Sequence, residues 1–165
     1  MDLERIVECL LGSGLEFVII GGYAAVVHGA IDVTRDIDIC CRFDDDSLAR
    51  LQGALAPLNP KHRLTLHDAP LDLQPGRNPP WRNLYLRTDA GIVDCLSEVL
   101  GVGGFDQVLA GSVSKRTSMG DLRVLDIPTL IQAKLAVGRP HDLRAAVQLR
   151  CLLDVPPAAE KSCDP

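Results

Sequence analysis

Three aspartates in this sequence have the side-chain type and the spacing that suit a divalent cation. Asp36 and Asp38 stand two positions apart in an apolar segment, so on a β-strand both carboxylates project from the same face. Asp94 lies in a second apolar segment, where an unpartnered carboxylate would be costly to bury. Carboxylate oxygens are the ligands that Mg²⁺ and Mn²⁺ prefer. Taken alone, the Asp36–Asp38 pair also fits a solvated strand face.

A glycine pair stands where the chain passes from an apolar run to a helical pattern. Gly21 and Gly22 follow residues 15–20 and precede residues 23–28. Such a turn lets a phosphate approach the backbone and directs free N–H groups toward it. Because a glycine pair alone also fits a plain tight turn, it is the combination with the aspartates that indicates a phosphate and metal site.

The periodicity of apolar residues predicts the elements that must position these groups. Helical spacing predicts helices at residues 2–12, 23–28, 44–55, 103–110, 128–137 and 141–153. Short apolar and alternating runs predict strands at residues 15–20, within 31–42, and at 63–67, 84–87, 92–96, 113–117 and 122–125, of which the last four form two hairpins. We therefore predict an α/β (α+β) fold in one domain, residues 1–155, followed by a flexible tail, residues 156–165.

Composition argues against several classes of function. Seventeen basic and 22 acidic side chains give a net charge of −5, which argues against broad binding to duplex DNA and leaves a local basic patch open. The most apolar stretch, residues 17–31, is too short and too interrupted by glycine to span a membrane, and no signal-peptide pattern opens the chain. We therefore expect a cytoplasmic protein. The six cysteines form no C-x-x-C pair, so we expect reduced thiols and no structural zinc site.

Taken together, these motifs resemble the DNA polymerase β-like nucleotidyltransferase superfamily. Residues 17–29 read FVIIGGYAAVVHG and residues 34–39 read TRDIDI. The family pattern is a hydrophobic strand, Gly-Gly or Gly-Ser, a short helix, an Asp-hydrophobic-Asp strand and a later lone Asp. Residues 84–96 are similar to the hairpin that carries this last Asp. Gly22 departs from the pattern, because many active members have Ser there.

The C-terminal part adds to the resemblance. The last helices of small bacterial members have a similar spacing of Lys134, Arg139, His141 and Asp142. His141 stands where those members usually have a more strongly basic residue. The resemblance extends over residues 15–153, and it is to the minimal and toxin–antitoxin-associated members rather than to polymerases. It implies a mixed central sheet flanked by helices.

The activity implied by the resemblance is transfer of a nucleoside monophosphate from a nucleoside triphosphate to a hydroxyl acceptor. Asp36 and Asp38 would hold one Mg²⁺ or Mn²⁺, and Asp94 would bridge a second ion or act as general base. The phosphates would be bound by the Gly21-Gly22 turn and by three cationic side chains, for which a surface or ion-pair role is the alternative. These are Arg35, Lys134 and Arg139.

Two other interpretations remain open. The domain could be a catalytically inactive nucleotide-binding or antitoxin-like partner protein that keeps its carboxylates. It could also be a plain α/β interaction domain, in which Arg35, Arg42 or Arg87 pairs with the acids. Metal-dependent consumption of nucleotide would distinguish an enzyme from the inactive partner protein. The absence of any stabilisation by nucleotide would favour the plain interaction domain.

The acceptor is not specified by the motifs. A small molecule, an RNA end or a protein hydroxyl would all fit, and because the chain has little room for an acceptor domain, a homodimer or a partner protein could complete the site. Trp81, the single tryptophan, is a candidate for stacking on a base or for anchoring the core, and His28 is expected to end a helix.

Overall fold

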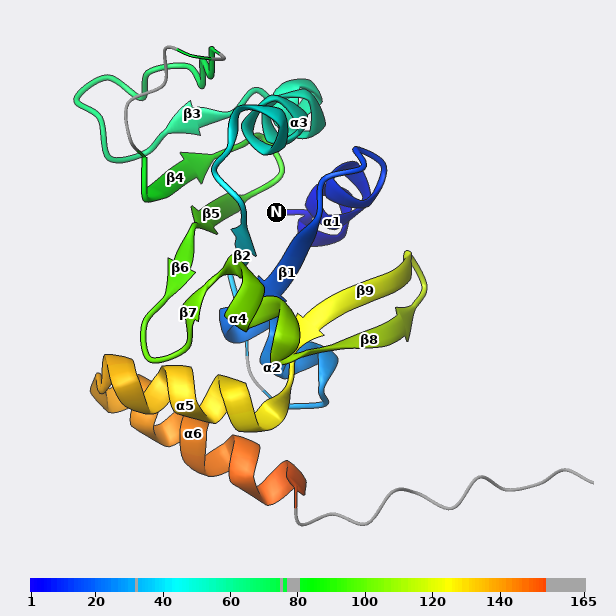
Figure 1. The fold of residues 1–165 in the computed structure, drawn as a ribbon, viewed down its shortest axis with the longest axis vertical. Helices are drawn as coiled ribbons and strands as arrows, with labels where there is room; N and C mark the ends of the chain where they lie inside the picture. The colour runs from blue at the N-terminus through cyan, green and yellow to red at the C-terminus, as the bar shows by residue number, and fades with distance from the viewer. Residues whose placement is uncertain (32, 75, 77–80, 154–165) are drawn as a thin grey trace, which may run out of the picture.

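The central sheet of the molecule contains seven strands in the part of the chain that the structure describes (Figure 1). This computed structural model describes residues 1–31, 33–74, 76 and 81–153, so the predicted tail lies outside it. The strand order is β3-β4-β5-β2-β1-β9-β8. The strands are β1 (Phe17–Ile20), β2 (Asp36–Cys41), β3 (Lys61–His62), β4 (Asn83–Arg87), β5 (Ile92–Leu96), β8 (Ser112–Thr117) and β9 (Gly120–Leu125).

The sheet is mixed, as the family resemblance implies. β2 pairs antiparallel with β1 and parallel with β5, and β1 pairs parallel with β9. β4–β5 and β8–β9 are the two predicted antiparallel hairpins. A small separate hairpin joins β6 (Glu98–Val99) to β7 (Gly103–Gly104).

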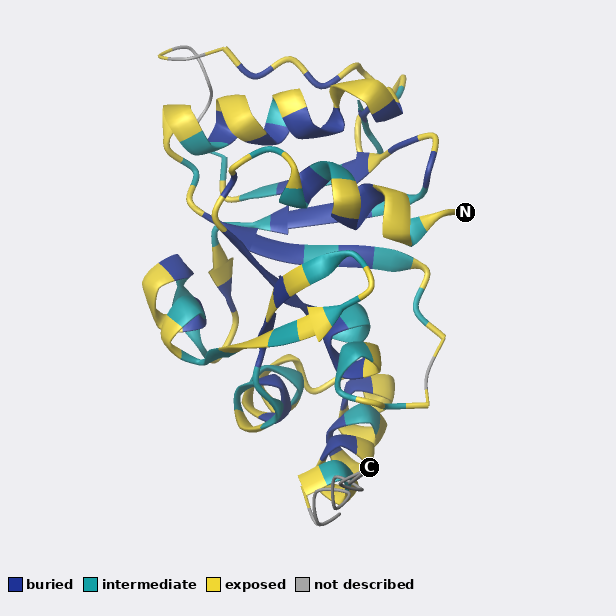
Figure 2. Ribbon diagram, turned by 90° about the vertical axis from the view of Figure 1, so that its right-hand side faces the viewer, coloured by how far each residue is buried: buried dark blue, intermediate teal, exposed yellow. Residues whose placement is uncertain are grey.

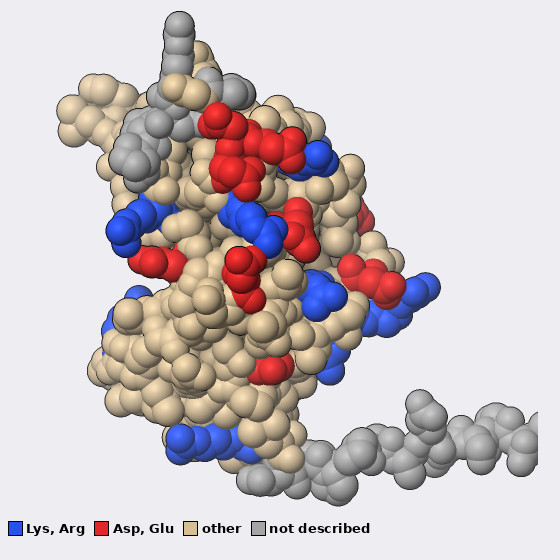
Figure 3. Space-filling model, viewed as in Figure 1, with Lys and Arg blue, Asp and Glu red and all other residues tan. Residues whose placement is uncertain are grey.

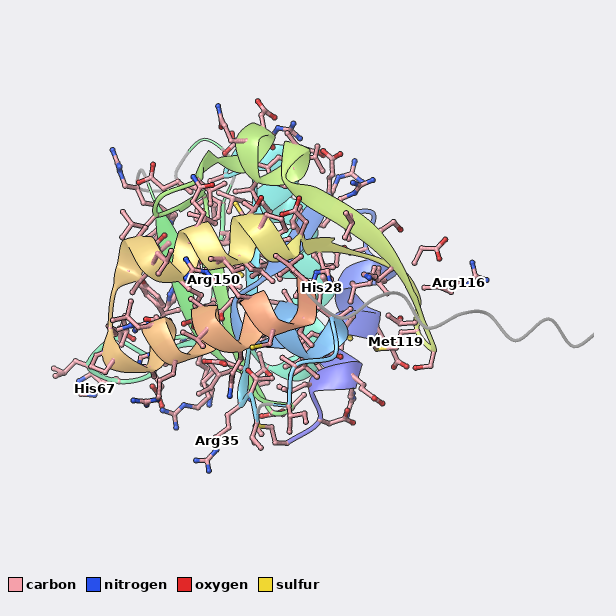
Figure 4. The ribbon with its side chains drawn as sticks, turned by 90° about the horizontal axis from the view of Figure 1, so that it is seen from below. His28, Arg35, His67, Arg116, Met119 and Arg150 are labelled. Atoms are coloured by element: carbon pink, nitrogen blue, oxygen red, sulfur yellow. The ribbon has the colours of Figure 1, made fainter. Side chains whose placement is uncertain are left out.

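The helices form two groups around the sheet. α1 (Leu3–Leu11) and α3 (Asp45–Leu55) pack side by side, and their outer faces are exposed while their inner faces join the core (Figures 1 and 2). α5 (Ile127–Val137) and α6 (Pro140–Leu153) form an antiparallel pair at the other end of the molecule (Figure 4). The short helices are α2 (Gly21–Val27), η1 (Ala56–Leu58) and α4 (Phe105–Ala110).

Local side-chain chemistry explains where the long helices begin. The carboxylate of Asp2 accepts a hydrogen bond from the N–H of Arg5, and Asp44 accepts one from Ser47. Asp126 caps α5 in the same way. Each cap satisfies a backbone donor that has no partner within the helix.

Alternation along β2 separates the core from the candidate site. Ile37, Ile39 and Cys41 are fully buried on one face, whereas Asp36 and Asp38 are partly exposed on the other. Burial raises the pKa of both Cys40 and Cys41 to about 12, so these thiols act as small core side chains.

Three sequence predictions differ from the structure. The strand predicted at residues 63–67 is wrong, because Thr65 bonds to the carbonyl of His62 and to the N–H of Ala69 and closes turns there. The predicted helix 103–110 begins only at Phe105, after β7. The helix predicted from residue 23 already begins at Gly21, so the glycine pair forms its first turn. In the described residues, no helix is both long and apolar enough to cross a bilayer.

Candidate nucleotide and metal site

The structure brings the three aspartates to one face of the sheet. Asp38 on β2 is the register partner of Asp94 on the neighbouring parallel strand β5, and Asp36 lies one pleat away on the same face as Asp38. Residues paired in register on adjacent strands point to the same side. In the described chain, no three Asp, Glu, His or Cys side chains are already arranged to hold one ion. The carboxylates therefore share a face without forming a closed three-ligand cage.

The electrostatics of this face disfavour three negative charges. Burial, together with the carboxylates of Asp36 and Asp94, raises the pKa of Asp38 to about 7, against the opposing effect of Lys134 and Arg63. Burial also raises the pKa of Asp94, although its bond to Arg63 opposes this. A cation bound beside Asp38 would remove the penalty on its ionised form.

The first turn of α2 lies directly against Asp38. Gly21 has a φ of +66°, and a Cβ added there would overlap with the Asp38 carboxylate. Position 21 therefore requires glycine both for its backbone conformation and for space. A Cβ on Gly22 would meet the hydroxyl of Thr34 at 2.9 Å, and that hydroxyl donates to Asp36 Oδ1 at 3.0 Å. Thr34 thus orients Asp36, a role that the sequence did not indicate.

An arginine that the sequence did not single out holds Asp94. Arg63 Nη2 donates to Asp94 Oδ2 at 2.5 Å, and Arg63 Nε donates to Oδ1 at 3.2 Å. The guanidinium carbon also lies 5.2 Å from the ring centroid of Tyr85. Of the arginines considered as partners for the acids, Arg42 instead pairs with Glu16 and Asp106. No local pattern could have identified Arg63, because 31 residues separate it from Asp94.

A cleft of about 700 Å³ opens beside Asp38, whereas Asp36, Asp94 and Arg63 are not among the residues that line it. Asp38 and Gly21 line it from the sheet and from α2, and Lys134 and Arg139 line it from the α5–α6 pair. The opposite wall comes from β4 and the β6–β7 hairpin. Its polar side chains are Arg82, Asn83, Tyr85 and Glu98.

Two of the predicted phosphate-binding residues converge on a buried acid. Lys134 Nζ lies 3.0 Å from Asp142 Oδ1, and Arg139 Nε lies 2.6 Å from Oδ2. Burial alone would raise the pKa of Asp142, but its hydrogen bonds to Arg139 and Lys134 outweigh this and lower it. Asp142 is fully buried, so it fixes both cations at the cleft wall. The third, Arg35, is exposed and projects away from the body of the molecule (Figure 4), outside the lining of the cleft.

Asp142→Asn should lower the free energy of unfolding by about 2–3 kcal/mol at pH 7, because it leaves two cations beside a neutral group. Since the pKa of Asp142 is lowered in the folded protein, the stabilisation is present above its unfolded pKa of about 3.9 and is lost as the pH falls through the folded value. Urea unfolding at pH 7 and at a series of pH values below the unfolded pKa of about 3.9 measures this. Asp121→Asn is the control, because Asp121 forms an exposed pair with Arg116. Equal effects of the two substitutions would contradict the prediction.

Two aromatic residues from the sequence prediction have structural contacts. His28 Nε2 lies 2.8 Å from the carbonyl oxygen of Leu125, at the C-terminal end of α2, as expected of a residue that ends this helix (Figure 4). Trp81 stacks on His62 with ring centroids 5.6 Å apart, and it packs against the core. Its indole N–H is buried and has no hydrogen-bond partner among the described residues.

The surface charge is mixed. On the face shown in Figure 3, acidic and basic side chains are interspersed over the described residues rather than gathered into a broad basic area. This distribution agrees with the net charge of −5.

Comparisons with known proteins identify the fold. No protein-family model matches the sequence, and no curated protein matches it either. Among solved structures, TM1012 of Thermotoga maritima, described as a candidate nucleotidyltransferase, is 18% identical with a TM-score of 0.58, over 92% of this chain and 90% of that one.

A second solved protein is the antibiotic-resistance factor ANT(2'')-Ia. Its solution structure is 15% identical with a TM-score of 0.54, over 92% of this chain and 90% of that one. Its crystal structure with adenylyl-2''-tobramycin is 13% identical with a TM-score of 0.54, over 92% and 95% of the two chains. At these identities the likeness concerns the fold. With its mixed sheet and flanking helices, this chain has the nucleotidyltransferase fold.

Proposed function

We propose that this protein is a metal-dependent nucleotidyltransferase that moves a nucleoside monophosphate from a nucleoside triphosphate to a hydroxyl acceptor. One observation carries the proposal: Asp36, Asp38 and Asp94 share the face of the sheet that meets the first turn of α2, and Asp38 lines a cleft of about 700 Å³. The fold shared with the solved nucleotidyltransferases supports it.

The donor set beside the cleft fits a hard divalent cation. Asp36 and Asp38 are separated by one residue on one face, and Thr34 already orients Asp36. Mg²⁺ is usually bound by one or two carboxylates, several waters and the substrate phosphates, so a closed protein cage is not needed. When bound, Mg²⁺ or Mn²⁺ would neutralise phosphate charge and act as a Lewis acid at the α-phosphorus.

The chain's own residues would bind and orient the two substrates. Asp94 would accept the proton of the attacking hydroxyl, and each of its oxygens has a lone pair beyond the one that Arg63 uses. The first N–H groups of a helix have no intrahelical acceptor and Ile20 provides no side-chain cap for α2, so the N–H groups of Gly21 and Gly22 would bind phosphate oxygens.

Cationic side chains at the cleft would assist binding of the triphosphate. Lys134 lies near enough to Asp38 to lower its pKa, and Arg139 keeps 61% of its side chain exposed while it pairs with Asp142. Asp142 holds both cations at the cleft wall. Such fixed positions favour phosphoryl transfer, because its catalysis depends mainly on positioning and on charge stabilisation. Arg35 stays a predicted phosphate contact from outside the cleft.

The size of the cleft favours a small acceptor. About 700 Å³ lies within the range of small-molecule sites, and the wall with Asn83, Tyr85 and Glu98 offers polar groups for a hydroxylated molecule. The complex of ANT(2'')-Ia with adenylyl-2''-tobramycin is an example of such an acceptor on this fold. RNA or protein acceptors, completion of the site by a homodimer or partner protein, and association with a toxin–antitoxin pair stay predictions from the resemblance.

ATP should stabilise the protein only when Mg²⁺ is present, because clustered carboxylates repel a triphosphate until a cation neutralises them. At a ligand concentration of about 100 times Kd the stabilisation should be about 2.7 kcal/mol, which corresponds to roughly 5–10 °C for a domain of this size. Thermal melting with ATP or GTP, in EDTA and in Mg²⁺, measures it. The same shift in EDTA would contradict the proposed site.

Transfer itself is tested by incubating the protein with α-³²P-labelled nucleoside triphosphates and Mg²⁺ or Mn²⁺ in whole lysate. Label should appear on a small molecule, and neither Asp38→Asn nor EDTA-treated samples should show it. Label on RNA or protein would revise the acceptor. Metal-dependent binding with no labelled product would support the inactive nucleotide-binding interpretation.

A further inference from the structure

The carboxylate of Asp94 is already bound to a fixed positive charge. Both of its oxygens accept hydrogen bonds from Arg63, at 2.5 and 3.2 Å, in a bidentate pair. The Asp94 side chain is only 12% exposed, and the Arg63 side chain is 26% exposed. Such pairs are geometrically specific and are among the stronger charge-assisted hydrogen bonds.

Arg63 is held in place by more than this ion pair. Its backbone N–H donates to the carbonyl of Tyr85 at 3.0 Å, and its guanidinium lies over the Tyr85 ring. Tyr85 on β4 is the register partner of Asp94 on β5, which in turn is the register partner of Asp38 on β2. Asp38, Asp94 and Tyr85 therefore form a row on one face, and Arg63 contacts Asp94 and Tyr85.

The contrast with Asp36 and Asp38 is clear. Neither of these carboxylates forms an ion pair with an arginine or lysine in the described residues, although the positive charges of Lys134 and Arg63 act on Asp38 at longer range. Asp36 accepts only from the Thr34 hydroxyl among side-chain donors in the same part of the chain. On this face, therefore, Asp94 is paired directly with a cation, whereas Asp36 and Asp38 are not.

We propose that Arg63 takes the place of a second metal ion at Asp94, so that the site binds one divalent cation, at Asp36 and Asp38, instead of two. The proposal rests on the proposed function and specifies the metal content of that site. Arg63 is a positioning residue: it compensates and orients Asp94 and makes no contact with the reacting phosphate.

Geometry opposes a second ion while Arg63 is in place. In two-metal sites the ions are about 3.5–4 Å apart and share a carboxylate. An ion on Asp94 would lie about 2.1 Å from an oxygen that already accepts a guanidinium N–H, and the two positive charges would repel each other. Arginine remains protonated at all accessible pH values, so the guanidinium charge is permanent.

Counting Mn²⁺ tests the proposal. The wild-type protein is mixed with Mn²⁺ and one equivalent of an ATP analogue in which a methylene replaces the α,β-bridging oxygen, and electron paramagnetic resonance measures bound ions. We expect one Mn²⁺ per chain with the spectrum of an isolated ion. Arg63→Met should bind two, with the spin coupling expected of ions about 3.5–4 Å apart.

Arg42→Met is the matched control. Arg42 also pairs with carboxylates and lies over an aromatic ring, that of Phe105 at 4.5 Å, but its partners are Glu16 and Asp106 rather than any of the three site aspartates. This variant should keep a count of one. Arg63→Lys should also keep one, because a positive charge remains beside Asp94.

The possible counts have distinct meanings. Two coupled ions in the wild type would overturn the inference and leave the proposed function intact, whereas no bound ion would overturn the proposed function itself. A count of one in a folded Arg63→Met variant would also overturn the inference, because something other than Arg63 would then exclude the second ion. If Arg63→Met does not fold, the wild-type and Arg63→Lys counts decide.

Discussion

Asp38→Asn should abolish metal-dependent binding of nucleoside triphosphate and, in EDTA, should raise the melting temperature of the protein. Asp38 is mostly buried between Asp36 and Asp94, and this environment raises its pKa to about 7. Asparagine keeps the side-chain volume and removes one of the mutually repelling charges. It also removes a carboxylate ligand that the proposed metal needs.

The stabilisation should depend on pH with a defined sign. The folded pKa of Asp38, about 7, is above the unfolded value of about 3.9. Asp38 therefore lowers stability increasingly as the pH rises from 4 to 7, with a full cost of up to about 4 kcal/mol above pH 7. Asp38→Asn should thus gain several degrees over the wild type at pH 8 and clearly less at pH 5, where about a third of this cost is present.

Melting temperatures of both proteins at pH 5 and pH 8, in EDTA and in Mg²⁺ with ATP, measure these effects. Asp121→Asn, at an exposed ion pair, serves as the control and should change neither quantity by much. A clear drop in the EDTA melting temperature of Asp38→Asn, with nucleotide stabilisation unchanged, would show that Asp38 is a structural ion-pair partner instead.

Gly21→Ala should be the most damaging single-methyl change at the site. Its φ of +66° is unfavourable for alanine, and the new Cβ would overlap with the Asp38 carboxylate. The backbone term is about 1 kcal/mol, and the steric overlap adds about 1–3 kcal/mol. Because Asp38 has to move, binding of Mg²⁺ with ATP should be lost together with stability.

Gly138→Ala is the control for the backbone term alone. Gly138 has a φ of +70°, and a Cβ there would meet its nearest atom, the Leu135 carbonyl oxygen, at an ordinary 3.6 Å. Urea unfolding should give a loss of about 1 kcal/mol for Gly138→Ala and roughly 2–4 kcal/mol for Gly21→Ala. Equal losses, with Mg²⁺–ATP binding kept in both, would show that Gly21 does not lie against the metal ligand.

Local patterns were sufficient for much of the fold. The alternation of residues 36–41 predicted which side chains of β2 enter the core, because successive side chains on a strand face opposite sides. Asp2 and Asp44 predicted helix starts, because a cap acts within three residues. The two hairpins and the start of α5 near Pro128 followed from equally local signals.

Local patterns failed where an element was too short or where a side chain redirected the backbone. β6 and β7 have two residues each, so they show no measurable period. The apolar residues of 63–67 suggested a strand, but the Thr65 hydroxyl bonds to backbone groups on both sides and favours a turn. Local hydrogen bonding prevailed there over strand propensity.

The sequence by itself determined that Asp36 and Asp38 share a face, because their spacing of two has only one outcome on a strand. Only the tertiary structure decided what the other charged groups contact. Arg63 reaches Asp94 across 31 residues, and Lys134 and Arg139 are paired with Asp142 across the α5–α6 turn. A buried carboxylate needs a partner, but any of the chain's cations could satisfy it, and strand register and helix packing select which one lies within reach.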